Sequence, residues 1–332
     1  MLRLNDSWVW DFWIIREQQT YHAFFLYASR ALHDPELRHR RAAIGHAVST
    51  DLVRWERVAD AVVHGSAPSF DQTATWTGSV VPGPDGRWYM FYTGATVTDE
   101  GQLLQQIGLT ISDDLYTWHK YERNPVVTAD SRWYEKLGGV HPWHDEHWRD
   151  PWVFEDPEGD GWHMLLTARA KSGSVTDRGV IGHARSPDLI TWTVQPPLTL
   201  PGQGFGYLEV PQVQVVDGRP VLIFNCDTRR LTPARAASGE AGEIWAAPIG
   251  DLAGPYDLRL AYPIAGGGLY VGKLVQGPKD DWVLLAFVEK DELGRFGGYV
   301  IDPQPVYWDG DVLRVTGHQR PTIGDPDAQR SA

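Results

Sequence analysis

Three acidic residues, Asp11, Asp150 and Glu209, lie near the heads of apolar stretches that are typical of buried strands. The stretch "HWRDPWVF" (147–154) places Arg149 and Asp150 before a proline, "VWDFW" contains Asp11, and "LEVPQV" contains Glu209. Buried charges cost free energy unless they are paired, and neighbouring carboxylates raise one another's pKa. Brought together, such acids can cleave a glycosidic bond, with one carboxyl attacking or activating water and another protonating the leaving oxygen.

Each acid also has a structural interpretation. Asp150 can cap a turn before Pro151, which is the better interpretation for an isolated Asp-Pro pair. Glu209 can be the ion-pair partner of an arginine. The catalytic interpretation is favoured when the acids occupy matching positions of a repeated unit, so it depends on the elements that carry them.

The chain repeats one pattern three times: "IGHAVSTDLVRW" from Ile44, "IGLTISDDLYTW" from Ile107 and "IGHARSPDLITW" from Ile181. Each copy predicts a strand, a turn built on Ser-x-Asp-Leu, and a Trp at the start of the next strand. Ahead of each copy lies another strand signal, and two further segments of that kind surround Leu222 and Leu284. These segments indicate five repeated units.

Before each of these five segments lies one more strand candidate, and turn signals such as "PDGR" and "VDGR" follow some of them. The five candidates are "VWDFWII", "TWTGSVV", "RDPWVF", "LEVPQVQVV" and "GLYVGKLV". Five four-stranded antiparallel sheets in series predict an all-β fold, a five-bladed β-propeller around a central funnel, as a single catalytic domain over residues 1–332 without a C-terminal β-sandwich. A two-sheet sandwich is the alternative. We expect "QPVYWDGDVLRV", near the C-terminus, to supply the strand that closes the ring.

The first strand of each blade lines the central channel of a propeller, so the repeat register becomes a functional argument. Asp11 falls on blade one, Asp150 on blade three and Glu209 on blade four, each near the start of an innermost strand. Aromatic residues, which stack on sugar faces, flank these acids: Trp10, Trp13, Trp76 and Trp152. The sequence therefore predicts one carbohydrate site at one rim of the funnel.

Composition argues against other function classes. The formal net charge of −13 is unfavourable for a nucleic-acid binder, because such proteins neutralise phosphates with Lys and Arg. The single cysteine, Cys226, forms no internal disulfide and is expected to be a buried core residue. No apolar segment resembles a signal peptide or approaches the roughly 20 residues that span a bilayer. We expect a soluble, cytoplasmic protein that acts on a small oligosaccharide without a cofactor, a nucleic acid or a membrane.

In their order, the motifs resemble those of the five-bladed glycosidases of glycoside hydrolase families 32 and 68, which act on β-fructofuranosides. "VWDFW" is similar to the family 68 segment Val-Trp-Asp-Ser-Trp, "TWTGS" to Trp-Ser-Gly-Ser, "WRDPWVFED" to the Arg-Asp-Pro motif, and "LEVPQV" to the acid/base segment. The resemblance implies that Asp11 is the nucleophile, Asp150 the transition-state stabiliser and Glu209 the general acid/base. It also implies a fructosyl subsite lined by Trp10, Trp76, Thr77 and Arg149, with Arg229 from "LIFNCDTRR".

The implied mechanism is retaining, and water or a second sugar can complete it, so hydrolysis and transfer both stay open. An inverting enzyme of the more distantly similar family 43 type, with Asp11 as general base, is one alternative. A sugar-binding propeller without catalysis is another. Val210 follows Glu209 where family 68 usually has Arg and family 32 usually has Cys, which leaves the identity of the sugar open.

Two further polar stretches are "HPWHDEHW" and "RHRR". "HPWHDEHW" (141–148) has three histidines spaced by three, a pattern that can hold zinc on one helical face. Its proline and the strand that follows favour a loop over the pocket, from which His144 or His147 contacts a sugar hydroxyl, so we expect no metal site. "RHRR" (38–41) predicts a solvated loop.

Overall fold

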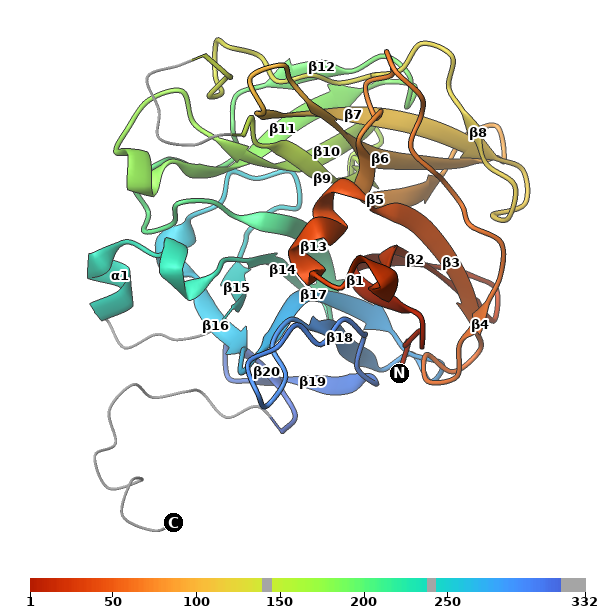
Figure 1. Ribbon diagram of the computed structural model, residues 1–332. Helices are drawn as coiled ribbons and strands as arrows, with labels where there is room; N and C mark the ends of the chain where they lie inside the picture. Colours follow the sequence, from red (N-terminus) through yellow and green to blue (C-terminus); the bar gives the residue numbers. More distant parts are fainter. Residues whose placement is uncertain (139–144, 238–242, 318–332) are drawn as a thin grey trace.

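The computed structural model describes residues 1–138, 145–237 and 243–317, and these form five antiparallel sheets of four strands each around a common centre (Figure 1). Each sheet uses four consecutive strands, so the predicted five-bladed β-propeller is confirmed. Blade one contains β1 (Ser7–Glu17), β2 (Thr20–Ser29), β3 (Ala43–Ser49) and β4 (Glu56–Arg57). Blade two contains β5 (Ala74–Pro82), β6 (Trp88–Val97), β7 (Leu103–Ser112) and β8 (His119–Lys120).

The other three blades follow the same order. Blade three contains β9 (Trp148–Glu155), β10 (Trp162–Arg169), β11 (Gly179–Ser186) and β12 (Thr193–Gln195). Blade four contains β13 (Glu209–Val216), β14 (Arg219–Asn225), β15 (Ile244–Pro248) and β16 (Tyr262–Ala265). Blade five contains β17 (Leu269–Gln276), β18 (Trp282–Val288), β19 (Gln304–Asp309) and β20 (Val312–Val315).

The helices lie in the connections between strands and are short. They are the 3-10 helices η1 (Arg30–Leu32), η2 (Pro35–Arg40), η3 (Val175–Asp177), η4 (Thr228–Arg230) and η5 (Leu258–Leu260), and the α-helix α1 (Pro233–Ala237). Among the residues that the structure describes, no helix has the length and apolar character to cross a membrane.

The repeated Ser-x-Asp-Leu-x-x-Trp pattern forms the same turn in the first three blades. In blade one, Oδ1 of Asp51 accepts the backbone N–H groups of Val53 and Arg54 at 2.9 and 2.8 Å, and the Trp55 indole donates to the Leu52 carbonyl at 3.1 Å. The leucine has a positive φ in each copy, 61° at Leu52, and its side chain is fully buried. The side-chain hydrogen bonds and the burial offset the cost of this backbone conformation. The Trp directly precedes the fourth strand of its blade, as the sequence predicts.

The prediction that residues 304–315 supply a strand that closes the ring is wrong. The stretch around residues 304–315 forms β19 and β20, which pair with each other and with β18 as the two outer strands of blade five. Blades one and five meet instead through a short bridge, in which Leu2 and Val300 exchange backbone hydrogen bonds of 3.0 Å. A hairpin with its own turn, "WDGDV", pairs these two strands with each other and completes blade five locally.

Every innermost strand is irregular near its start. Each of these strands has one point at which its pairing register with the neighbouring strand shifts. These points are Val9/Phe12 in β1, Trp76/Gly78 in β5, Arg149/Trp152 in β9, Glu209/Gln212 in β13 and Tyr270/Lys273 in β17. Such β-bulges bend a strand and redirect its side chains. Asp150, Val210 and Val271, which lie inside three of them, have φ values of 59°, 49° and 49°. The bulges therefore redirect the side chains at one end of the channel.

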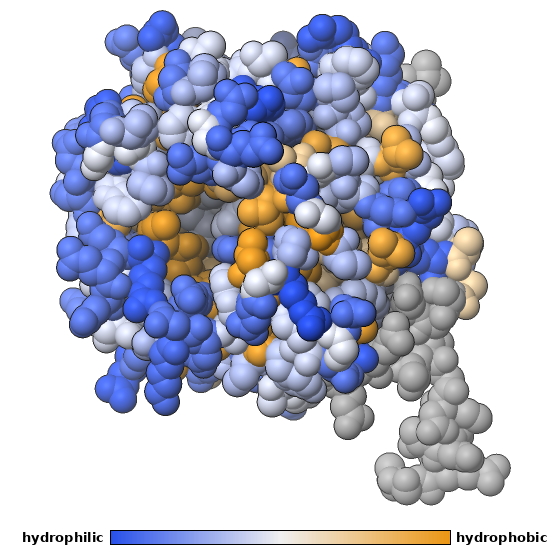
Figure 2. Space-filling model, turned by 180° about the vertical axis from the view of Figure 1, so that it is seen from behind, coloured by the Kyte–Doolittle hydropathy of each residue, from blue (hydrophilic) through white to orange (hydrophobic). Residues whose placement is uncertain are grey.

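The core is divided among the contacts between neighbouring sheets, and Cys226 lies buried in it, as predicted. Figure 2, the view from behind, shows apolar side chains gathered around a hollow near the middle of that face.

Candidate active site

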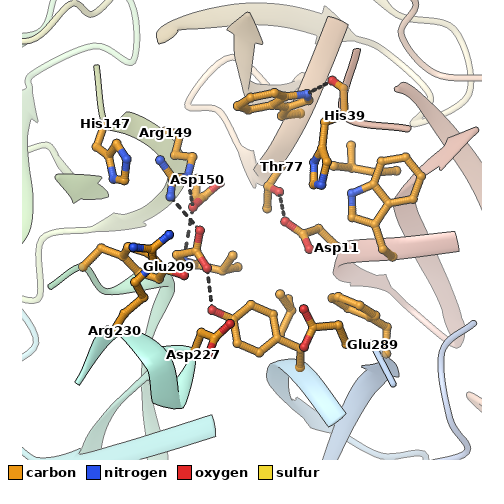
Figure 3. Close-up of a pocket in the computed structure, with 18 of the residues that line it drawn as sticks. Asp11, His39, Thr77, His147, Arg149, Asp150, Glu209, Asp227, Arg230 and Glu289 are labelled. Atoms are coloured by element: carbon orange, nitrogen blue, oxygen red, sulfur yellow. Dashed lines mark hydrogen bonds and ion pairs between the residues drawn. The ribbon is translucent and has the colours of Figure 1, made fainter. Parts of the chain in front are cut away.

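A cavity of about 960 Å³ lies at the end of the channel where the bulges occur. All five innermost strands contribute to it, and their polar side chains point into a common space (Figure 3). These side chains are Asp11 of β1, Thr77 of β5, Arg149 and Asp150 of β9, Glu209 of β13 and Tyr270 of β17. The three predicted acids therefore meet in one pocket. Their positions relative to the bulge differ, since Asp11 and Asp150 lie inside it and Glu209 lies just before it.

Asp11 reaches the pocket with only part of its surface exposed. The Thr77 hydroxyl donates to its Oδ2 at 2.5 Å, which fixes one carboxylate oxygen and leaves Oδ1 toward the cavity. Burial raises the pKa of Asp11 to about 7, and the negative charges of Asp150 and Glu209 add to this effect, while Thr77 and Arg38 oppose it. Asp11 is thus a carboxyl that changes charge near neutral pH.

Arg149 connects the other two acids. Its Nη2 donates to Oε1 of Glu209 at 2.6 Å, and its Nε lies 3.4 Å from Oδ2 of Asp150. Its Nη1 donates to the side chain of Gln105 at 3.1 Å, which holds the guanidinium against blade two. Arg149 and Asp150 are both buried, at 8% and 4% exposed. A planar guanidinium can hold two carboxylates at fixed angles, which a lysine cannot.

Asp150 does not cap a turn, so the structural interpretation of the Asp-Pro pair is wrong. Its backbone N–H donates to Thr93 at 2.9 Å, and its Oδ2 accepts from Thr167 at 2.7 Å and from the N–H of Val210 at 3.3 Å. Burial raises the pKa of Asp150, while Arg149 opposes the rise. The bulge before Pro151 thus turns this carboxylate toward the pocket.

Glu209 is an ion-pair partner of an arginine, as its structural interpretation predicts, and it also lines the pocket. Its second oxygen, Oε2, accepts a hydrogen bond of 2.5 Å from the hydroxyl of Tyr270, one blade away. The sequence contains no signal for this contact, because Tyr270 lies in a stretch, "GLYVGK", without a recognisable motif. Two donors therefore orient Glu209 from either side.

The predicted aromatic and basic residues divide between the pocket and its surroundings. Trp10, Trp76 and Arg229 line the cavity, and Arg229 is mostly exposed and paired with Asp227. Trp13 does not line the cavity, since it is buried and stacks on Phe24 at 6.1 Å between ring centres. Trp152 also lies outside the lining. His144 falls outside the described residues.

The prediction of a solvated loop at residues 38–41 is wrong for its first two residues. Arg38 is 6% exposed, with its guanidinium carbon 3.9 Å from the ring centre of Phe296 and 5.7 Å from that of Trp10. His39 lines the cavity near Thr77 and Asp11 (Figure 3), and its carbonyl accepts the indole N–H of Trp76 at 2.8 Å. Asp34 and Pro35 start η2 in the sequence "DPE", which folds this segment over the pocket rim.

No set of three or more His, Cys, Asp or Glu side chains within the described ranges is arranged to hold a metal ion. Part of the histidine-rich stretch, residues 141–144, is outside those ranges. His147, which is within them, lines the pocket, and burial lowers its pKa well below the usual value. It stands there as a neutral ring.

The family described as "Glycosyl hydrolases family 32 N-terminal domain" matches this chain over residues 13–240. Asp150 and Glu209 lie inside this range, and Asp11 lies two residues before it. The chain is 32% identical over 193 residues to an insoluble β-fructofuranosidase isoenzyme of Arabidopsis thaliana, covering 58% of this chain and 32% of the relative. It is 30% identical over 217 residues to the sucrose-6-phosphate hydrolase of Bacillus subtilis, covering 63% and 39%. The chain thus spans well under half of the length of these relatives.

Solved structures share the fold over nearly the whole chain. An inulosucrase from Halalkalicoccus jeotgali bound to kestose superposes with a TM-score of 0.77 at 22% identity, over 96% of this chain and 90% of that one. A family 32 β-fructofuranosidase from Bombyx mori gives a TM-score of 0.70 at 19% identity, over 95% and 63%. At these identities the similarity concerns the arrangement of the blades.

Proposed function

The chain belongs to the glycosyl hydrolases family 32 N-terminal domain family, and from this premise we propose that it is an enzyme that cleaves or transfers the fructosyl group of β-fructofuranosides. The observation that carries the proposal is the meeting of Asp11, Asp150 and Glu209, from three different blades, in one cavity. Two carboxyl groups on either side of a glycosidic bond are what this chemistry needs.

In the first step, a carboxylate oxygen of Asp11 attacks the anomeric carbon of the fructosyl unit. The bond from that carbon to the leaving oxygen breaks, and Glu209 gives its proton to that oxygen. The contact with Thr77 supports the role of Asp11, because it holds Oδ2 and directs the free oxygen to the cavity. The contact with Tyr270 supports the role of Glu209, because a positioned acid must face the leaving group.

Asp150 and Arg149 bind the sugar in this proposal. Both are almost fully buried and held by several hydrogen bonds, so they are rigid. Hydrogen bonds from the fructosyl hydroxyls to the Asp150 carboxylate would strengthen as positive charge develops at the anomeric carbon. Trp10 and Trp76 both line the cavity and give its wall aromatic surface.

In the second step, Glu209 removes a proton from an incoming hydroxyl, which attacks the anomeric carbon and releases the Asp11 carboxylate. Water as the acceptor gives hydrolysis, and a sugar gives transfer. Relatives of both kinds support this range: the sucrose-6-phosphate hydrolase of Bacillus subtilis, and a fructosyltransferase of Allium cepa that is 35% identical over 88 residues. The cavity of about 960 Å³ has room for a short oligosaccharide.

The test is chromatographic and uses the purified protein beside Asp11→Asn. Both are incubated with sucrose, short inulin- and levan-type oligosaccharides and aryl arabinofuranosides, and products are followed from the first minutes. Fructose release or new fructosides with the wild type, absent with Asp11→Asn, is the expected result. NMR of the first product distinguishes retention from inversion. Activity on arabinosides alone, or inverted product, would favour the inverting alternative. Sugar binding without any turnover, unchanged in Asp11→Asn, would favour a binding propeller.

A further inference from the structure

Lys273 is a buried lysine near the centre of the propeller. It is the fifth residue of β17, directly after the bulge at Val271 and Gly272, and it is 2% exposed. Its Nζ lies 5.1 Å from the ring centre of Trp152, which follows the corresponding bulge of β9. Blades five and three are not neighbours in the ring, so this contact crosses the channel. Neither residue lines the cavity, whereas Val271 and Asp150, each two positions earlier on the same strand, do line it, so the ammonium lies behind the pocket floor.

The position itself does not require a charge. The residues that follow the bulge in blades one, three and four are Phe12, Trp152 and Gln212, and all three are neutral. In the part of the chain that the structure describes, the Lys273 ammonium has no hydrogen bond or ion pair. Burying an ammonium without compensation costs several kcal/mol or neutralises it. The Trp152 ring supplies part of that compensation, and negative charges that act on the ammonium supply more.

Asp150 and Asp11 are the negative charges that act on the Lys273 ammonium. Glu209 and Asp150 both contact Arg149 directly, whereas the hydrogen bond that the structure gives the Asp11 carboxylate comes from the neutral Thr77. Arg38, the other cation that acts on Asp11, has Glu36 as its own partner at 3.1 Å. Burial lowers the pKa of Lys273 to about 8, and the charges of Asp150 and Asp11 oppose this fall. The lysine stays largely protonated below that pH.

We propose that Lys273 is a positioning residue that acts through the two aspartates: from behind the pocket floor, its ammonium supplies the counter-charge that keeps Asp11 ionised beside Asp150. The charged groups that act on Asp11 are Asp150 on β9, Glu209 on β13 and Arg38 in η2. In this proposal Lys273 on β17 joins them, and the charges of Asp150 and Asp11 oppose the fall in its own pKa. The consequence for catalysis rests on the proposed function, since it needs Asp11 as nucleophile. The charge coupling between Lys273 and Asp11 does not depend on the proposed function.

The test measures the ionisation of Asp11 directly. Protein with ¹³C-labelled aspartate carboxyls is titrated by NMR, with the Asp11 signal assigned from Asp11→Asn. Removing the charge with Lys273→Met is expected to raise the titration midpoint of Asp11 by about one pH unit, since the loss of a nearby opposite charge in a protein interior has an effect of that order. Lys120→Met, which removes a lysine paired with Asp71 on blade two, is the matched control and is expected to leave the midpoint unchanged.

The acid limb of kcat/KM is expected to move upward by the same amount in Lys273→Met and to stay in place in Lys273→Arg, which keeps the charge. An unchanged Asp11 midpoint in Lys273→Met, even with lower stability or rate, would overturn the proposal and leave a packing role.

If no fructoside is turned over by the wild type, the proposed function fails, while the NMR titration still decides the coupling. If Lys273→Met does not fold, the reciprocal titration decides it: Asp11→Asn should lower the ¹⁵Nζ midpoint of Lys273. An unchanged midpoint there would equally overturn it.

Discussion

The guanidinium of Arg149 donates from Nη2 to Oε1 of Glu209 over 2.6 Å, and this contact joins blade three to blade four at the pocket. We expect Arg149→Lys to lower kcat/KM by at least about 10²-fold, because one ammonium cannot hold both Glu209 and Asp150 in place. Arg149→Ala should also lower the free energy of unfolding by roughly 3 kcal/mol, since it leaves buried carboxylates without their partner. Steady-state kinetics and urea denaturation measure the two effects. Full activity in Arg149→Lys would contradict this account of the site.

Asp11→Asn is expected to stabilise the protein at alkaline pH while it removes activity. The pKa of Asp11 is about 7 when folded and 3.8 in the unfolded reference. The folded chain holds this proton to higher pH, so the free energy of unfolding falls as pH rises from about 4 to 7, by up to about 1.4 kcal/mol for each pH unit. Asparagine avoids this loss. Denaturation curves at pH 8 should show Asp11→Asn above the wild type, with no advantage at pH 4 and none for Asp280→Asn, whose side chain is exposed.

The same pKa of Asp11 predicts how kcat/KM falls toward low pH. If Asp11 must be ionised to attack, kcat/KM should fall tenfold per pH unit below about pH 7. The profile is measured with one substrate from pH 5 to pH 9, with stability checked at each point. A rate that is flat down to pH 5 would rule out Asp11, with this pKa, as the nucleophile.

Arg38→Ala is expected to weaken substrate binding. The guanidinium lies between Phe296 and Trp10, and its Nη1 donates to the Pro35 carbonyl at 2.8 Å, so it fixes η2 and with it His39. We expect KM to rise about tenfold with a smaller change in kcat, and the stability to fall by about 1 kcal/mol from the lost cation–π contact. Arg40→Ala, in the exposed neighbour, is the control. Equal kinetics for the two variants would show that η2 does not shape the site.

Two buried histidine pairs predict a loss of stability in acid. His46 lies 3.0 Å from His22 in blade one, and His183 lies 2.9 Å from His163 in blade three, as distances between ring nitrogens. Burial lowers the pKa of His46 and of His183 to about 3. Because the unfolded chain takes up protons below about pH 6.5, stability falls as pH drops from there, by up to about 2 kcal/mol per histidine at pH 5.

The measurement for these pairs compares urea midpoints at pH 7.5 and pH 5. His46→Gln and His183→Gln should each reduce the difference between the two midpoints, and His64→Gln, in an exposed residue, should not. A wild type with equal midpoints at both pH values would argue against buried neutral rings.

Much of the fold is predictable from the sequence because its signals are local. The Ser-x-Asp-Leu-x-x-Trp turn forms from hydrogen bonds within seven residues, and its three copies give the repeat from which the blades follow. The hairpin turns give the order of strands in each sheet. Asp11, Asp150 and Glu209 could be placed on innermost strands because the period of the repeat fixes which strand each one occupies.

What tertiary structure alone decided is how side chains from different blades meet. The bulges turn Asp150 into the pocket, and no pattern in "RDPW" distinguishes this from a capped turn. Tyr270 donates to Glu209, Arg38 lies between Trp10 and Phe296, and Lys273 contacts Trp152 across the channel. The residues that make these contacts are separated by 28 to 258 positions in the sequence. Such contacts depend on the closure of the ring, which fixes all five strand ends at once. A sequence pattern describes one strand and its neighbours, so it predicts the blades and leaves the charge balance at their centre to the assembled fold.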